Sequence, residues 1–228
     1  MQENLTEIIV VLDRSGSMAS VKSDVIGGFN SFIENQKKEE GSALVTLVQF
    51  DNQYETVYSG RDIQEVELLT EQTYVPRSMT ALLDAVGRSI VDVTVRLEGI
   101  HQDDRPDKVI MVILTDGHEN SSKEFTRDKV QAMIKEQREE HSWEFVYLGA
   151  DDQAFAEARG MGIPVGNVAK YSQGSRGTEA AYVVLREAVS AYRHNPHGIA
   201  SNDLVVNSST ARSSSDISVD SSDSSSNG

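Results

Sequence analysis

The sequence contains no cysteine, which excludes disulfide bonds and thiolate metal ligands and fits a reducing compartment. It also lacks any run close to the roughly 18 consecutive apolar residues that a membrane-spanning helix needs. The first apolar run begins so soon after Met1 that it leaves no room for a secretory leader. We therefore expect a cytoplasmic protein with no membrane segment.

Basic residues are scarce, with 21 lysines and arginines against 36 acidic residues and a net charge of -15. Because they form no local cluster, a nucleic-acid partner is not expected. The excess carboxylates suit either solubility or a hard divalent cation. With 38% hydrophobic and 25% charged residues in 228 positions, the composition is that of one ordinary globular domain.

Apolar runs and helical periodicities alternate along the chain. Continuous apolar runs, typical of strands buried on both faces, occur at 7–13, 107–117 and 143–151, with a shorter run near 163–168. Runs 43–51 and 53–60 are separated by a turn and predict an antiparallel hairpin at a sheet edge. Helical spacing predicts helices over 20–40, 80–97, 125–140, 153–159 and 178–193. This order predicts an α/β fold with a doubly wound, mainly parallel sheet, one antiparallel edge strand, and helices on both faces.

The periodic pattern ends near residue 194. We therefore predict one domain over 1–194, followed by a serine- and aspartate-rich tail over 195–228. The tail has too little apolar surface to offset the entropy of ordering it, so disorder is expected. The short run DLVVN at 203–207 leaves open a small strand or docking segment within it.

Polar residues stand where the predicted strands end. Asp13 ends the first strand and is followed at alternate positions by Ser15 and Ser17; Asp116 ends the most apolar strand, and Thr80 opens a helix. In an open parallel sheet, such positions converge at the carboxyl edge. Two carboxylates and three hydroxyls form an oxygen-only set that suits Mg²⁺ or Mn²⁺, with Ca²⁺ less favoured. Neutral hydroxyls would also leave the cation able to take a further anionic oxygen.

Three segments carry a family resemblance. VVLDRSGSM, SMTALLDAV and VILTDGHEN resemble, in order and spacing, the three loops of the metal-ion-dependent adhesion site of von Willebrand factor A domains, and the resemblance covers roughly residues 5 to 193. It is of the bacterial or phage intracellular type and implies a Rossmann-like fold. It also implies a protein partner that donates an aspartate or glutamate to the cation. By position, the implied metal ligands are Asp13, Ser15, Ser17, Thr80 and Asp116.

The short D-x-S-x-S pattern alone is weak, because Asp220, Ser222 and Ser224 in the tail repeat it without a preceding strand. Its context makes the first copy specific: an apolar strand before it, an amphipathic helix after it, and the two matching loops. The alternative is a set of loop-capping serines and aspartates in a generic α/β protein.

Neighbouring residues suggest the character of the rim. Gly16 and Gly117 allow tight turns around a cation, or are ordinary turn glycines. His118 follows Asp116 closely and is either a surface residue or a partner contact. Glu119 with the pair Asp151 and Asp152 could make the rim acidic and favour partners with a basic flank, the alternative being solvated loop acids.

A glycine-rich segment at 171–182 lacks the lysine of a phosphate-binding loop and the spacing of a dinucleotide motif. We interpret it as a loop followed by a helix that Thr178 caps.

Two classes of function compete. The favoured one is a non-enzymatic, metal-dependent protein-binding module, with three variants left open: an adaptor subunit of an AAA-type ATPase, a member of a stress- or metal-resistance complex, or a phage component. The other is a magnesium-dependent phosphatase, because haloacid-dehalogenase-like enzymes also begin with an aspartate after the first strand. Those enzymes need a second acid two residues on, where this chain has Ser15, so we expect no enzyme. The sequence predicts neither the partner's identity nor an oligomeric state.

Overall fold

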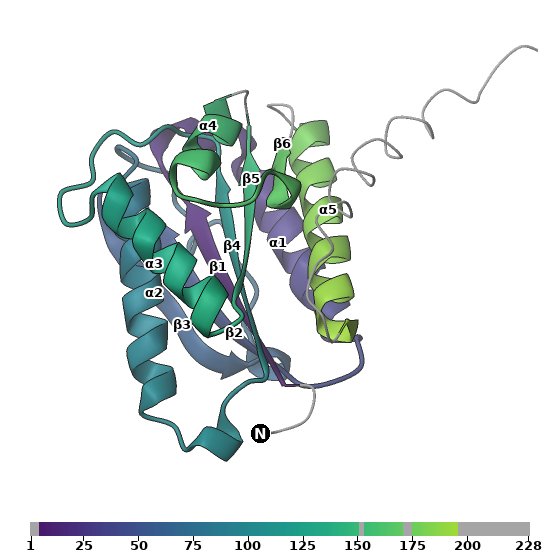
Figure 1. Cartoon of the computed structure of the whole chain (residues 1–228). Helices are drawn as coiled ribbons and strands as arrows, with labels where there is room; N and C mark the ends of the chain where they lie inside the picture. Colours follow the sequence, from purple (N-terminus) through teal and green to yellow (C-terminus); the bar gives the residue numbers. More distant parts are fainter. Residues whose placement is uncertain (1–4, 151–152, 171–174, 196–228) are drawn as a thin grey trace, which may run out of the picture.

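The computed structural model describes residues 5–150, 153–170 and 175–195. Its centre is a six-stranded sheet in the order β3-β2-β1-β4-β5-β6 (Figure 1). The strands are β1 (Thr6–Asp13), β2 (Ala43–Phe50), β3 (Tyr54–Asp62), β4 (Lys108–Thr115), β5 (Glu144–Gly149) and β6 (Val168–Lys170). All neighbouring pairs are parallel except β2 with β3. The predicted mixed sheet with one antiparallel edge strand is confirmed.

Strand β1 lies in the middle of the sheet, between β2 and β4. Every residue of β1 is buried, which explains why its apolar run does not alternate with polar residues. Its side chains divide between two cores: Ile8 and Leu12 pack on one side of the sheet, and Ile9 and Val11 on the other.

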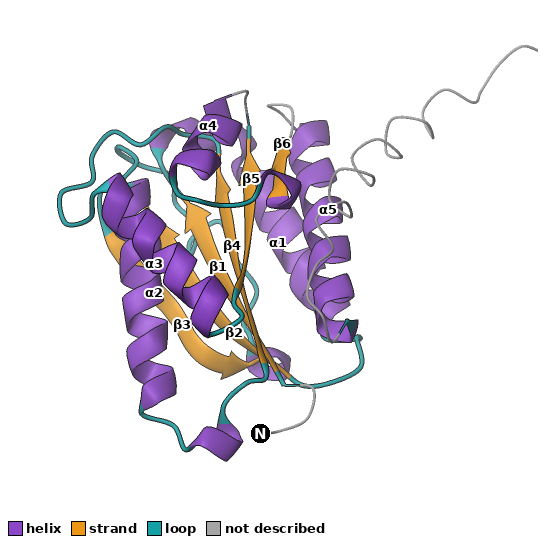
Figure 2. Cartoon of the chain, in the orientation of Figure 1, coloured by secondary structure: helices purple, strands orange, loops and turns teal. Residues whose placement is uncertain are grey.

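Helices cover both faces of the sheet, as predicted (Figure 2). The core on one face includes residues of α1 (Lys22–Gln36) and α5 (Ser175–His194), and these two helices contact each other. The core on the other face includes residues of α2 (Leu82–Glu98), α3 (Arg127–Glu140) and α4 (Gln153–Gly160). No helix within the described ranges is long and apolar enough to cross a membrane.

Two predicted boundaries near the end of the domain are wrong. The segment predicted as a strand at 163–168 contains a 3₁₀ turn at Val165–Asn167, and β6 starts only at Val168. Helix α5 begins at Ser175, so Thr178 lies buried inside the helix and does not cap it. Residues 171–174, 151–152 and 196–228 lie outside the described residues, and with them the predicted tail, the DLVVN segment and the second serine motif.

Candidate metal centre

The first loop leaves β1 at Asp13, whose side chain is completely buried. The backbone N–H of Ser15 donates to Asp13 Oδ1 at 2.6 Å, which folds the loop back on the carboxylate. The hydroxyl oxygens of Ser15 and Ser17 lie 3.0 Å apart. A short 3₁₀ helix, Gly16–Val21, then leads into α1. The loop therefore gathers its three oxygen-bearing side chains on one side of a turn.

The third loop follows β4 and touches the first loop directly. The hydroxyl of Ser17 donates to Asp116 Oδ1 at 2.5 Å, although the two residues are 99 positions apart. Thr115, the last residue of β4, donates its hydroxyl to Asp13 Oδ2 at 2.5 Å. Because β1 and β4 are parallel neighbours, their carboxyl ends bring both aspartates to the same edge.

The second loop supplies Thr80, which is almost fully buried. Thr80 was expected to open a helix, but helix α2 begins at Leu82 and its N-cap residue is Ala81, whose side chain makes no capping hydrogen bond. Asn120 holds Thr80 in place: its Oδ1 accepts from the Thr80 N–H at 3.0 Å, and its own N–H donates to the Thr80 carbonyl at 3.0 Å. The Thr80 side chain is thus free of a capping role and belongs to the loop cluster.

Gly117 shows how closely the three loops approach one another. A Cβ atom placed on Gly117 would lie 2.7 Å from Thr80 Oγ1 and 3.3 Å from both Asp13 Oδ2 and Ser15 Oγ. One oxygen from the second loop and two from the first therefore surround a single point beside the third loop. Glycine is required here because any larger residue would fill the space that these oxygens surround.

The donor chemistry of this cluster fits a hard divalent cation. Two carboxylates balance its charge, and hydroxyl oxygens are acceptable neutral ligands. The described residues contain no group of three or more histidine, aspartate or glutamate side chains placed to hold a metal, so any such site here depends on its hydroxyls. The structure therefore brings all five predicted ligand residues into one cluster.

Burial raises the pKa of Asp13 from its ordinary 3.8 to about 6, opposed by the hydrogen bonds from Thr115 and Ser15 and assisted by the nearby charge of Asp116. Burial without a counter-charge disfavours the ionised form of a carboxyl group. A cation bound at the loops would supply that counter-charge.

Glu119, for which the sequence left open an acidic rim or a solvated loop acid, is half-buried in the structure. Its carboxylate points inward and caps helix α2, accepting from the Leu83 N–H at 2.9 Å. The same carboxylate accepts from the N–H groups of Ser121 and Ser122 at 3.0 and 2.8 Å. His118 is exposed beside the site, and Asp151 and Asp152 lie outside the described residues.

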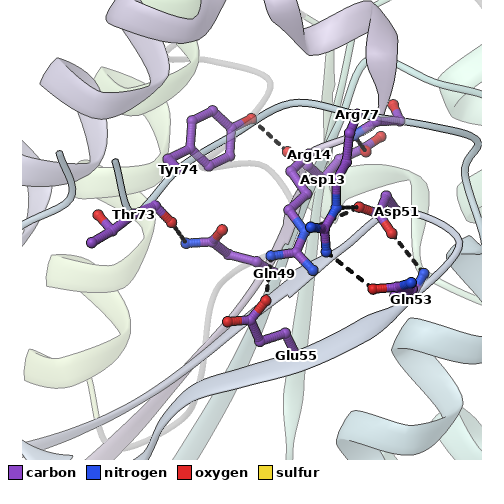
Figure 3. A network of polar contacts seen from close by, with 10 residues as sticks. Asp13, Arg14, Gln49, Asp51, Gln53, Glu55, Thr73, Tyr74 and Arg77 are labelled. Carbon is purple, nitrogen blue, oxygen red and sulfur yellow. Dashed lines mark hydrogen bonds and ion pairs between the residues drawn. The ribbon is translucent and has the colours of Figure 1, made fainter. Parts of the chain in front are cut away.

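Several residues that support the site were not predicted. Thr115 and Asn120 position Asp13 and Thr80, and the hydroxyl of buried Tyr74 donates to the Asp13 carbonyl at 2.6 Å (Figure 3). Thr115 and Asn120 are part of the third motif, VILTDGHEN, so their positions were a usable signal. Tyr74 lies in an irregular segment, where no periodicity marks it.

The chain thus combines a doubly wound, mainly parallel sheet with a cluster of oxygen-bearing side chains at the carboxyl edge of that sheet. The family model for the von Willebrand factor type A domain matches residues 7–171, and the chain belongs to that family. Members of the family are typically metal-dependent protein-interaction modules.

Among solved structures, the chain is similar to proximal thread matrix protein 1 from the mussel byssus. One structure of that protein matches at 14% identity with a TM-score of 0.59, covering 83% of this chain and 46% of the mussel chain. Another, described as having a zinc-occupied metal-ion-dependent adhesion site, matches at 14% identity with a TM-score of 0.57, covering 80% of this chain and 47% of the other. This chain thus spans about half the length of the mussel protein, and the likeness shows the shared fold. No curated protein matches the sequence.

Proposed function

We propose that this protein is a non-enzymatic, metal-dependent protein-binding module. In this proposal Asp13, Ser15, Ser17, Thr80 and Asp116 hold Mg²⁺ or Mn²⁺, and a carboxylate from a protein partner completes the coordination. The observation that carries the proposal is the convergence of oxygens from the first and second loops on one point beside Gly117 of the third loop, where Asp116 contacts Ser17. The zinc-occupied site described for the mussel protein of the same fold supports a divalent cation at this position.

The balance of charge favours a partner with an acidic side chain. Two carboxylates neutralise a divalent cation, while the neutral hydroxyls leave it electrophilic. A further anionic oxygen is therefore a better ligand than a neutral one. Ser15 occupies the position at which a phosphatase of the haloacid-dehalogenase type needs its general acid, and a serine hydroxyl does not protonate a leaving group at neutral pH. This supports binding over catalysis.

The second loop offers contacts beside the metal centre. Met79 directly precedes Thr80 and is 53% exposed, and the side chain of Arg77 is 48% exposed. The preceding Ser78 has a positive φ of 64°, and its carbonyl accepts from the Gly16 N–H at 3.0 Å, which ties the loop to the first one. A partner whose carboxylate reaches the cation would therefore meet an apolar and a basic side chain beside it.

The test is selection of peptides from a random library on the immobilised protein, with MgCl₂ in one arm and EDTA in the other. We expect the selected peptides to need Mg²⁺, and to lose binding when one aspartate or glutamate is changed to its amide. Asp116→Ala should abolish binding, whereas Asp128→Asn, an exposed acid on α3, should not change it. Met79→Ala should keep the Mg²⁺ affinity. It should weaken peptide binding about tenfold, because the bound peptide no longer covers the apolar Met79 side chain. Peptides that bind equally well in EDTA would refute the proposal.

The adaptor role beside an AAA-type ATPase or in a resistance complex is the finer alternative, and it uses the same site. Selection with a candidate ATPase in place of the peptide library would distinguish it.

A further inference from the structure

Asp51 lies directly after β2, at the same edge of the sheet as the candidate metal centre. Its side chain is completely buried, yet it belongs to none of the three metal-binding motifs. Strand β2 pairs with β1 so that Phe50 lies opposite Asp13. A buried carboxylate is costly unless it is paired and hydrogen-bonded, so its contacts indicate what it does.

Two arginines share one oxygen of this carboxylate (Figure 3). Arg14 Nε donates to Asp51 Oδ2 at 3.2 Å, and Arg77 Nε donates to the same atom at 2.6 Å. Arg14 stands in the first loop between the ligands Asp13 and Ser15, and Arg77 stands three residues before Thr80. The other oxygen, Oδ1, accepts from the Gln53 N–H at 2.6 Å.

The backbone around Asp51 joins the same two loops. The Asp51 carbonyl accepts from the N–H of Ala81, the residue after Thr80, at 2.8 Å. The N–H of Arg14 donates to the Phe50 carbonyl at 2.7 Å, and the N–H of Arg77 donates to the Arg14 carbonyl at 2.7 Å. The end of β2 therefore contacts both the first and the second loop through backbone and side chain.

We propose that Asp51 is a positioning residue of the metal centre, which fixes the first and second loops relative to each other so that Ser15 and Thr80 face the same cation. The inference rests on the proposed metal binding. Without the Asp51 carboxylate, Glu55 is the one acidic partner left to buried Arg14 among the described residues; its side chain is 57% exposed and lies 2.5 Å from Arg14 Nη1. Arg77 then loses its ion pair to Asp51, and with it the side-chain link that runs through Asp51 to Arg14 in the first loop.

The experiment measures the Mg²⁺ dissociation constant by calorimetry and the melting temperature in EDTA, for the full chain and its variants. Asp51→Asn should weaken Mg²⁺ binding about 10- to 100-fold, the usual effect of losing a group that orients metal ligands. Arg77→Gln leaves the Asp51–Arg14 pair in place and should weaken binding severalfold. It tests the inference even if Asp51→Asn fails to fold.

Two matched controls separate positioning from charge and from general stability. Glu55→Gln removes one negative charge from the same network without breaking the link between the loops, and it should change Mg²⁺ affinity less than threefold. Glu7→Gln removes another fully buried carboxylate, which pairs with Arg96 at the opposite end of β1. It should lower the melting temperature in EDTA and leave the Mg²⁺ affinity unchanged.

Wild-type affinity in folded Asp51→Asn and Arg77→Gln would overturn the inference while leaving the proposed function intact. A loss of affinity in either control as large as that in Asp51→Asn would also overturn it, because charge or stability would then explain the effect. If the unaltered protein binds no Mg²⁺, the proposed function itself fails.

Discussion

Replacement of Asp13 by asparagine should show how much folding free energy is lost when the buried Asp13 side chain ionises without a bound cation. Burial raises the pKa of Asp13 from 3.8 to about 6, so folding of the metal-free protein favours the protonated carboxyl group. This contribution to stability is fully present below pH 4 and is lost as the pH rises through about 6. Because each pKa unit corresponds to about 1.4 kcal/mol, the full loss is about 3 kcal/mol. About 2 kcal/mol of it falls between pH 4.5 and 7.5.

Asparagine carries no titrating group, so it removes this pH dependence while keeping a side chain of nearly the same size. The free energy of unfolding of both proteins should be measured by urea denaturation in EDTA at pH 4.5 and 7.5. Between pH 4.5 and 7.5 we expect the free energy of unfolding of wild type to fall by about 2 kcal/mol relative to that of Asp13→Asn, because only wild type ionises a buried carboxyl group. Hydrogen bonds that the variant loses lower its free energy of unfolding at both pH values, so they cancel when the two pH values are compared.

An equal difference between the two proteins at both pH values would refute the reasoning, because Asp13 would then titrate alike in the folded and unfolded chains. Addition of Mg²⁺ at pH 7.5 supplies the second half of the test. At a concentration of about 100 times its dissociation constant, it should stabilise wild type by about 2.7 kcal/mol and leave Asp13→Asn unchanged.

Three further substitutions test separate parts of the structure. Gly117→Ala should abolish the Mg²⁺-induced rise in melting temperature, since the new methyl group would lie 2.7 Å from Thr80 Oγ1; a retained rise would show that the cation does not occupy this space. Thr126→Ala should cost about 1 kcal/mol in urea denaturation without affecting Mg²⁺ binding, because the Thr126 hydroxyl caps helix α3. Gly28→Ala should destabilise the fold by about 1 to 3 kcal/mol, because its Cβ would lie 2.1 Å from the Tyr182 ring where α1 meets α5. A melting temperature equal to that of wild type would mean that the two helices separate at little cost.

The sheet could be predicted from the sequence because its central strands are buried on both faces. Continuous apolar runs as short as those of β1 and β4, set between helical segments, are typical of central strands in a parallel sheet. Strand β6 was misplaced because only three residues pair with β5, too few to set a pattern. The start of α5 was misplaced because Thr178, a good capping residue by type, is buried inside the helix.

The clustering of the five candidate ligand residues was predictable because they follow strand ends in recognisable motifs. What sequence could not show was the direction of each polar side chain. Glu119 was considered either for the rim or as a solvated loop acid, but the N–H groups at the start of α2 draw its carboxylate inward. Asp51, at the end of the run 43–51, was not singled out, because its two arginine partners lie 37 and 26 residues away along the chain. Such contacts depend on the packing of loops, which local patterns do not record.

The most direct test of the central claim is a Mn²⁺ titration followed by electron paramagnetic resonance, on wild type and on Thr80→Ala. Thr80 carries no charge, so the loss of its hydroxyl should weaken cation binding by removing an oxygen from the site and not by changing the charge of the site. We predict saturable binding at a single site in wild type and clearly weaker binding in Thr80→Ala, with the variant still folded. Equal binding by the two proteins, or none by wild type, would contradict the claim that the three loops form one metal centre.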